Sequence, residues 1–333
     1  MTTIKDVAAL AGVSTATVSR ALSQPDKVTE ETRERVLQAV KSCGYKMNTA
    51  ARQFRRQRTE TILVLVPDIG NPFFSNIIQG IESCAQQHNY RVILGETDTG
   101  RAEAESYAGY MRQQHADGAI LLSVDGVENF IADNTNIPVV LACEYLPVSP
   151  CPTVRIDNTQ AAEDAVAHLL ELGHRRIAYI NGPAASPLSI DRLRGYRSAL
   201  QSAGITVEQE LIVQGDYSPE SGYACAKQLL AMVTPPSAIF AASDPMAIGV
   251  MRAAGECGCR IPEDLSLVGF DDIRFAEFMT PSLTTIHQPR ELIGSTAMQQ
   301  LLLLLDDTTP QQDSVLEHQL VIRESTGRPT RKL

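Results

Sequence analysis

The stretch IKDVAALAGVSTATVSRAL, residues 4–22, predicts two short helices joined by a tight turn. Ile4, Val7 and Ala11 recur at helical spacing and give the first helix one apolar face. Gly12 can adopt the positive φ that a tight turn between helices requires. The stretch therefore predicts a helix-turn-helix unit, which places its second helix in the major groove of DNA.

The second helix would present a polar face to the DNA. Ser14 is a suitable N-cap, and Val18 would face the other helices. Arginine can bond a guanine edge through two N–H groups, threonine can bond several bases, and a methyl group can pack on thymine. The residues that we expect to contact DNA here are Thr15, Ala16, Thr17, Ser19 and Arg20. An ordinary pair of antiparallel helices is the alternative interpretation.

A third helix would complete this N-terminal headpiece, residues 1–46. Val36, Leu37 and Val40 would form its buried stripe, and Gly44 is placed to end it. Three helices in so short a span make a minimal DNA-binding unit.

The next segment, residues 47–60, would form a hinge helix and a linker. So short a helix is marginal on its own, because helix nucleation is costly. We expect it to fold on DNA and to insert Phe54 between base steps of the minor groove, with Arg55 in the basic cluster beside it. The alternative is a protease-sensitive linker.

Charge is divided unequally along the chain. Residues 1–60 hold 11 Lys and Arg against 6 Asp and Glu, and the remainder holds 18 against 33. A head of net charge +5 on a body of −15 indicates that the head alone touches DNA.

The composition predicts a soluble protein with two or three compact units in its 333 residues. Met1 leads straight into the helical pattern, and the longest leucine run, residues 301–305, is far shorter than the roughly 20 residues of a membrane span. Seven scattered cysteines suit a reducing compartment. We therefore expect a cytoplasmic protein that associates with the nucleoid when bound to DNA, has no membrane partner, and holds no metal or cofactor.

From residue 61 onward, strands and helices alternate. TILVLVPD, residues 61–68, is a run of apolar residues typical of a parallel strand buried on both faces. The alternation restarts at Thr159 and predicts two doubly wound α/β units in succession. A long helix over residues 290–305 and a last strand within residues 318–325 would follow.

Several stretches together resemble the LacI/GalR family of bacterial transcriptional regulators over essentially the whole chain. Besides the headpiece and the hinge NTAARQF, they are TILVLVPDIGNPFFSNIIQGIE, LGHRRIAYINGP, RLRGYRSAL, SDPMAIGVMRAAGECGCRIPEDLSLVGFDD and PSLTTIHQP. The headpiece and the VPDI–PFFS stretch resemble most the cytidine-repressor branch. Phe54 departs from the aliphatic wedge that is common in the family.

The resemblance implies a body like a periplasmic binding protein, with the effector held between two α/β subdomains. It implies three crossovers, near Asn158, near Pro289 and near residues 316–318. The implied subdomains are residues 61–158 plus 289–316 and residues 159–288 plus 317–333.

The implied effector site lies at the carboxyl ends of strands, where open α/β sheets bind their ligands. Aromatic residues of this family stack on the ligand, and their counterparts here are Phe73, Phe74 and Tyr217, of which we expect Phe74 to stack rather than Phe73. Core packing is the alternative for each ring. The resemblance also implies that Arg192 hydrogen-bonds the ligand and that Asp271 accepts from its hydroxyl groups.

Three further acidic residues are candidates for ligand contact. Glu144 follows a strand and is placed to accept from an exocyclic amine. Asp157 would face the ligand or belong to the crossover. Asp244 would contact the ligand or, slightly favoured, cap the following helix.

Ring stackers with paired Asp and Arg fit a nucleoside such as cytidine, and a sugar or a purine is the alternative effector. The expected partners are double-stranded operator DNA, a second copy of this chain in a homodimer and, through the branch resemblance, the cAMP receptor protein. A solute-binding protein is the alternative function. The motifs of nucleotide-binding enzymes, serine hydrolases and zinc peptidases are missing, so we expect no enzymatic activity.

Overall fold

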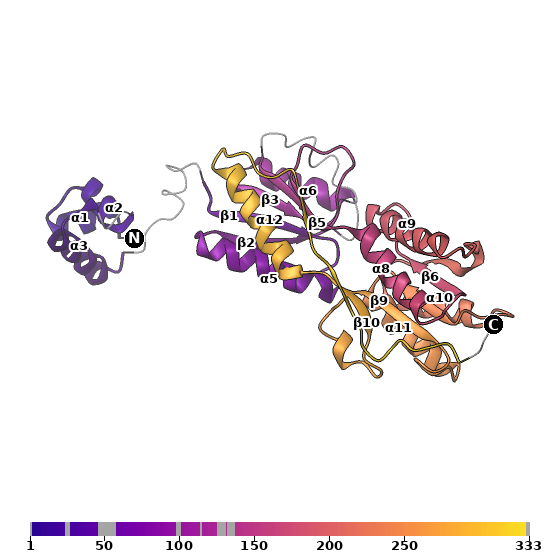
Figure 1. The fold of residues 1–333 in the computed structure, drawn as a ribbon. Coiled ribbons are helices and arrows are strands. Elements are labelled where there is room, and N and C mark those ends of the chain that lie inside the picture. Colours follow the sequence, from indigo (N-terminus) through magenta and orange to yellow (C-terminus); the bar gives the residue numbers. More distant parts are fainter. Residues whose placement is uncertain are drawn as a thin grey trace. The chain divides into compact units, whose positions relative to one another are not determined.

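The computed structural model describes residues 2–23, 27–45, 58–97, 101–113, 115–124, 131 and 137–330. The chain divides into two units, Met1–Arg58 and Thr59–Leu333, which are described separately (Figure 1). The predicted hinge residues Phe54 and Arg55 lie outside the described residues.

The described residues of the first unit form three helices: α1 Ile4–Ala11, α2 Thr15–Ser23 and α3 Glu30–Cys43. Gly12 and Gly44 end α1 and α3 in the left-handed region, with φ of 62° and 61°. Arg35 ties α3 to the turn, because its Nη2 donates to the Ala11 carbonyl at 2.5 Å. The turn and the helix end are therefore as predicted.

The core of the headpiece differs from the prediction at one residue. Val36 and Ala39 are buried on α3, and Val40 packs beside them. Leu37 was predicted to be buried, but 46% of it is exposed. Val36 and Val40 already fill the face toward α1 and α2, and Leu37 follows Val36 directly, about 100° further round the helix.

The second unit begins with a sheet of six parallel strands in the order β11-β5-β4-β3-β1-β2. Its strands are β1 Thr61–Val66, β2 Arg91–Glu96, β3 Gly118–Leu121, β4 Val139–Ala142, β5 Thr153–Ile156 and β11 Asp313–Leu316. The helices described beside it are α5 Pro72–Gln87, α6 Arg101–Arg112 and α12 Arg290–Leu305.

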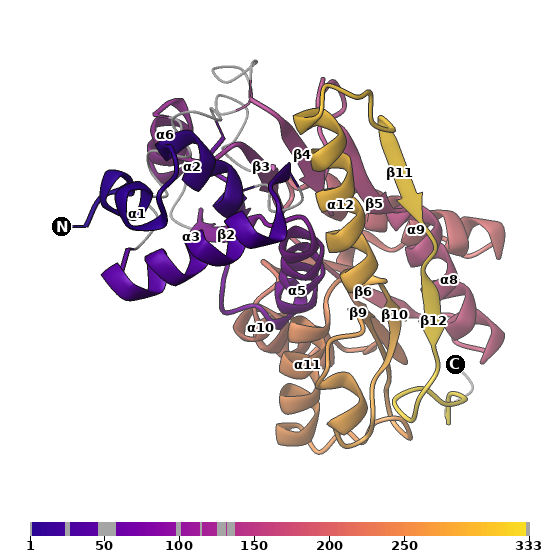
Figure 2. The same cartoon turned by 90° about the vertical axis from the view of Figure 1, so that its left-hand side faces the viewer.

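Strand β1 is buried on both faces, as its unbroken apolar run predicts. Ile62 and Val64 pack in the cluster that contains α5, whereas Leu63 and Leu65 pack with α6. Helices α5 and α12 lie side by side on one face of the sheet (Figure 2).

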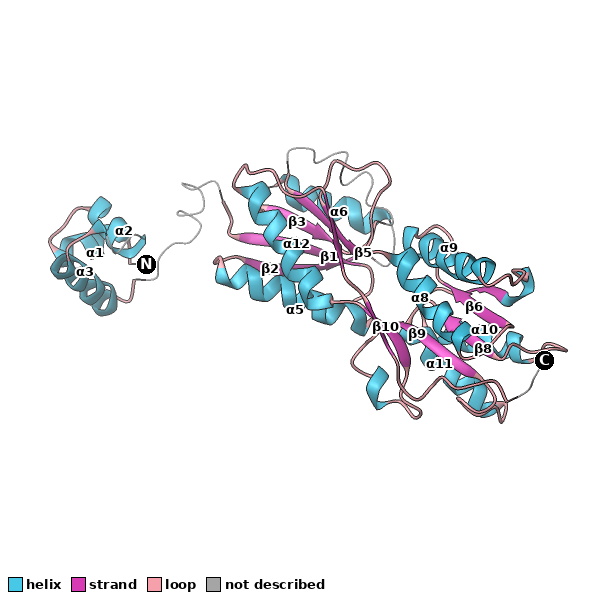
Figure 3. Ribbon diagram, in the orientation of Figure 1, coloured by secondary structure: helices cyan, strands magenta, loops and turns pink. Residues whose placement is uncertain are grey.

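A second sheet of six strands follows, in the order β12-β10-β9-β8-β6-β7. Figure 3 labels four of them, β6, β8, β9 and β10. Its strands are β6 Ile177–Asn181, β7 Ile212–Gln214, β8 Ala238–Ala241, β9 Ser266–Asp271, β10 Thr284–His287 and β12 Gln319–Val321, of which β12 alone is antiparallel to its neighbour. Its helices, packed in pairs, are α8 Asn158–Glu171 with α9 Pro187–Ser202 and α10 Pro219–Leu230 with α11 Asp244–Glu256.

The chain passes between the two sheets three times. It leaves the first sheet after β5, returns between β10 and α12, and leaves again between β11 and β12, which follow one another closely in Figure 2. We call the part built on the first sheet the first half of the body, and the part built on the second sheet the second half. The predicted fold class, a helical headpiece with two doubly wound α/β units, is confirmed.

Two strands of the first sheet were not predicted. Strands β5 and β11 are short, pair with each other and complete one edge of the first sheet. Helix α9 begins at Pro187, because proline suits the first position of a helix.

Candidate effector site and DNA-reading helix

Helix α2 presents the predicted polar face. Ser14 caps it, since its Oγ accepts from the Thr17 backbone N–H at 3.1 Å, and Val18 is fully buried. Thr15, Ala16 and Arg20 are exposed, whereas Thr17 and Ser19 are partly buried. The exposed residues are free to meet a DNA groove, and the DNA contacts of all five residues stay predictions.

Arg192 is the most strongly fixed of the predicted effector residues. Its side chain is 3% exposed, its Nε donates to Asn158 Oδ1 at 2.9 Å, and its Nη1 donates to the Ala242 carbonyl at 2.6 Å. The guanidinium carbon lies 3.7 Å from the centre of the Phe270 ring. Its Nη2 lies 4.0 Å from Asp271 Oδ1, so the guanidinium and this carboxylate face each other.

Asp271 ends strand β9 in an unusual backbone conformation, with φ of 116°. It is 5% exposed, and its Oδ1 accepts from Gln288 Nε2 at 2.8 Å. Burial raises the pKa of Asp271 to about 6, although Arg192 and Arg290 oppose this shift. The carboxyl group therefore titrates unusually close to neutrality.

Tyr217 follows β7 with φ of 72° and shares a hydrogen bond of 2.8 Å with Ser189 through its hydroxyl group. Its ring lies against Gly182, where an added Cβ would come 2.1 Å from Tyr217 Cζ. The guanidinium carbon of Arg192 is 6.0 Å from the ring centre. Arg192, Asp271 and Tyr217 are thus brought together at the carboxyl ends of the second sheet.

Phe73 and Phe74 lie in the first turn of α5, which Asn71 caps. Their ring centres are 5.1 Å apart in an edge-to-face arrangement, and they are 6% and 9% exposed. Both rings therefore contribute to the core, and stacking of Phe74 on a ligand stays a prediction.

Asp157 and Glu144, two of the acidic residues predicted to contact the ligand, have different surroundings. Asp157 is exposed and caps α8, accepting from the Gln160 N–H at 3.0 Å. Glu144 is 9% exposed, and both of its carboxylate oxygens accept hydrogen bonds from the protein. Ligand contacts by either residue stay predictions.

The slightly favoured interpretation of Asp244, that it caps α11, is wrong. Ser243 caps that helix, accepting from the Met246 N–H. Asp244 is fully buried, and its oxygens accept from the Ile273 N–H at 2.8 Å and the Thr285 hydroxyl at 2.6 Å. It therefore ties the start of α11 to strand β10 and to the chain after β9, while burial raises its pKa well above the ordinary range.

Several residues around Arg192 were not predicted as part of this site. Asn158 and Gln288 hold Arg192 and Asp271, and each lies at a crossover between the halves. Cys143 follows β4 and is 5% exposed; burial, with the Glu144 and Asp271 carboxylates, raises the pKa of its thiol. Only the position after a strand could have suggested Cys143.

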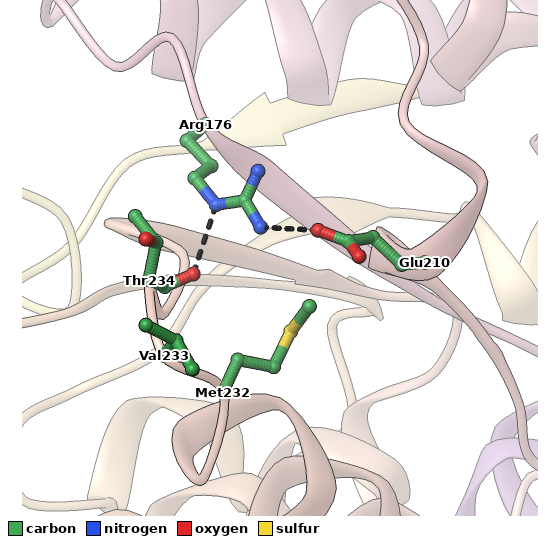
Figure 4. Close-up of a pocket in the computed structure, with 5 residues that line it drawn as sticks. All are labelled: Arg176, Glu210, Met232, Val233 and Thr234. Atoms are coloured by element: carbon green, nitrogen blue, oxygen red, sulfur yellow. Dashed lines mark hydrogen bonds and ion pairs between the residues drawn. The ribbon is translucent and has the colours of Figure 1, made fainter.

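A pocket of about 380 Å³ lies elsewhere in the second half (Figure 4). Arg176 lines it and donates to the Thr234 carbonyl, to Glu208 and to Glu210. These residues precede β6, β7 and β8, so the pocket lies at the opposite end of the strands from Arg192 and Asp271. Because each of the three guanidinium nitrogens already donates to the protein, we do not assign the effector to this pocket.

The part of the chain that the structure describes holds neither a metal-binding cluster nor a helix that could span a membrane. No group of three or more His, Cys, Asp and Glu residues there is arranged to hold a metal ion. None of the described helices is both long enough and apolar enough to cross a membrane.

Comparison with known proteins assigns the two units. Residues 3–48 match the model of bacterial regulatory proteins of the lacI family, and residues 166–326 match a periplasmic binding protein-like domain. The HTH-type transcriptional repressor CytR of Escherichia coli (strain K12) is 44% identical over 330 residues, covering 97% of this chain and 96% of CytR.

Solved structures agree with the assignment of both units. The lac repressor dimer bound to operator and the anti-inducer ONPF matches with a TM-score of 0.88 and 31% identity, covering 98% of this chain and 99% of that one. The transcriptional regulator CelR in complex with cellobiose matches with a TM-score of 0.76 and 35% identity, covering 98% and 100%.

A helix-turn-helix unit on a body of the periplasmic-binding-protein type defines a DNA-binding transcriptional regulator. The chain belongs to the LacI family and is one of its DNA-binding repressors, which confirms the resemblance found in the sequence. Its relatives are repressors rather than enzymes or solute-binding proteins. Repressors of this family act as dimers on operator DNA and respond to small-molecule effectors.

Proposed function

We propose that the repressor is controlled by a nucleoside, with cytidine as the first candidate, bound between the two halves beside Arg192, Asp271 and Tyr217. The observation that carries this proposal is the fixed guanidinium of Arg192 facing a buried carboxylate. A guanidinium and a carboxylate together suit the donor and acceptor demands of adjacent ribose hydroxyl groups. The identity of 44% with CytR supports the choice of nucleoside.

The effector would act by changing how the two halves close on each other. That change would alter the operator affinity of a homodimer. By its resemblance to the cytidine-repressor branch, we expect the nucleoside to release the DNA.

A sugar is the second candidate, because hydroxyl groups of a hexose suit the same Arg–Asp pair. CelR was solved with cellobiose, so the relatives of this chain include one that binds a sugar. A purine is the third, and would depend on ring stacking by Tyr217 or Phe74.

A thermal-shift screen of nucleosides, sugars and purines tests these candidates, because a ligand that binds only the native state raises its melting temperature. We expect cytidine to raise it in the wild type and not in Asp271→Ala. Operator binding of that variant should be retained but should no longer respond to cytidine. Stabilisation by a sugar or a purine alone would replace the nucleoside in this proposal.

The partner and location follow from the same proposal. We expect the repressor to work in the cytoplasm, on nucleoid DNA, and to bind operators together with the cAMP receptor protein. Operator binding measured with and without that protein checks the second point, since a partner that contacts the repressor raises its apparent affinity.

A further inference from the structure

Glu144 joins the two halves of the body through a single carboxylate. Its Oε2 accepts from the Ser123 hydroxyl at 2.9 Å and from the Val124 N–H at 2.8 Å, both just after β3 in the first half. Its Oε1 accepts from the Ser186 hydroxyl at 2.9 Å, and Ser186 is the residue that precedes α9 in the second half.

Tyr145, the next residue, makes a second bridge. Its hydroxyl group donates to Asp191 Oδ2 at 3.0 Å, and Asp191 lies in the second turn of α9 and is 4% exposed. Burial, followed by this hydrogen bond, raises the pKa of Tyr145, so the phenol keeps its proton at neutral pH. The guanidinium carbon of Arg155 lies 5.2 Å from the centre of the tyrosine ring and helps to hold it.

Both bridges end on the start of the helix that carries Arg192. Ser186 and Asp191 precede Arg192 by six residues and by one, and Arg192 is itself fixed to Asn158. Separation of the halves would break the two bridges, and it would also change the position of Arg192 relative to Cys143 and Glu144. The bridges and the candidate effector site therefore share one rigid element.

We propose that Glu144 and Tyr145 form a clamp on the start of α9 that holds the two halves closed and thereby sets the affinity for the effector. This inference rests on the proposed effector site. A ligand held by both halves binds the closed arrangement, so its apparent affinity is reduced by whatever fraction of molecules is open. Tyr145, Ser186 and Asp191 are positioning residues, which act without touching the ligand, and Glu144 holds Ser186 in addition to its predicted ligand contact.

Affinity for cytidine, measured by calorimetry at 25 °C, tests the clamp. Loss of one net hydrogen bond corresponds to an increase of about fivefold in a dissociation constant. Tyr145→Phe should therefore weaken cytidine binding by about that factor. Tyr223→Phe is the matched control, because the Tyr223 hydroxyl donates to Glu256 at 2.6 Å entirely within the second half. Unchanged affinity in Tyr145→Phe, or an equal loss in Tyr223→Phe, overturns the proposal.

A second pair of variants separates the clamp from ordinary stabilisation of the fold. Ser186→Ala removes the donor to Glu144 and should weaken cytidine binding about fivefold, whereas Ser186→Thr keeps a hydroxyl group and should restore it. If the threonine variant binds as weakly as the alanine variant, the hydroxyl group is not what matters and the clamp is wrong.

Hydrogen exchange of the free protein tests the clamp without any effector. The Val124 amide and the amides of the first turn of α9 should exchange faster in Tyr145→Phe than in Tyr223→Phe, because the halves separate more often. If cytidine does not bind, the proposed function fails, but faster exchange still supports the clamp. Equal exchange in the two variants overturns it.

Discussion

The guanidinium carbon of Arg192 lies 3.7 Å from the centre of the Phe270 ring, so a charged group is packed on an aromatic face in the interior. A cation over an aromatic ring is attracted by the electrons of its face, and the attraction is stronger away from water. Hydrogen bonds to Asn158 and to the Ala242 carbonyl use two of the remaining donors. Arg192 is thus held in place before any ligand arrives.

Replacement of this arginine by lysine should therefore be costly. Arg192→Lys keeps the charge but loses the planar group and one of the two hydrogen bonds, so we expect a loss of about 2 kcal/mol in the free energy of unfolding. Urea denaturation measures it. Arg252→Lys, at an arginine whose side chain is 77% exposed, should change the stability little, and similar losses in the two variants would contradict the role given to Arg192.

The raised pKa of Asp271 predicts a pH dependence of effector binding. Burial raises this pKa to about 6, so the carboxylate that would accept from the ligand is replaced by the neutral acid below that pH. We expect cytidine affinity to fall by about tenfold for each pH unit below 6. Calorimetry between roughly pH 5 and 8 measures this affinity. The affinity of the wild type should fall at low pH, whereas that of Asp271→Asn should not change with pH.

The same shift affects the stability of the free protein with a defined sign. The folded pKa lies above the ordinary value of 3.8, so the folded state binds more protons than the unfolded state between about pH 4 and 6. The contribution of Asp271 to stability is therefore fully present below pH 4 and is lost as the pH rises through 6. As the pH rises from about 4 to 6, the free energy of unfolding of the wild type should fall relative to that of Asp271→Asn. The same pH dependence in both proteins would refute this prediction.

Gly80 on α5 and Gly294 on α12 set how closely these two helices approach. A Cβ at Gly80 would come 2.1 Å from the Glu291 carbonyl oxygen, so Gly80→Ala should push the helices apart and cost about 3 kcal/mol. Gly255, near the end of α11, has no such neighbour within 4 Å, and Gly255→Ala should be neutral or stabilise by up to about 1 kcal/mol. Thermal unfolding of both variants checks this contrast, which would disappear if the helices could shift freely.

The exposed face of α2 predicts which headpiece residues read DNA. Arg20→Ala should weaken operator binding by about tenfold to a hundredfold and relax the preference for one base pair. Arg33 lies on α3 and pairs with Glu30 at 3.9 Å. As the control, Arg33→Ala should leave the sequence preference unchanged. Binding to operator and to single-base variants of it measures both effects; an unchanged preference in Arg20→Ala would exclude base contact by this residue.

Local patterns were sufficient to predict most of the fold. The apolar run of β1, the caps at Ser14 and Gly44, and the boundaries of α12 all depend on residues close in sequence. Strands β5 and β11 were missed because each is short and is stabilised by pairing with a segment more than 150 residues away.

The candidate site was less predictable, because its side chains depend on distant partners. The family resemblance pointed to Arg192 and Asp271, and position after a strand favoured Tyr217; the structure brings the three together. The same rule could not show that Asp244 would bond Thr285, 41 residues further along, or that Glu144 would bond Ser186, 42 residues away. Both carboxylates have partners supplied by other elements of the body.

The short step from β11 to β12 has a consequence for synthesis on the ribosome. The first sheet lacks its edge strand and the second lacks its antiparallel strand until residues 313–321 have been made. Domains usually fold in order as the chain emerges, N-terminal first. Here a nascent chain that ends before residue 290 leaves the α12-facing side of α5 uncovered. Both halves are therefore completed almost together. Until then, the uncovered apolar side of α5 is a surface that chaperones can bind.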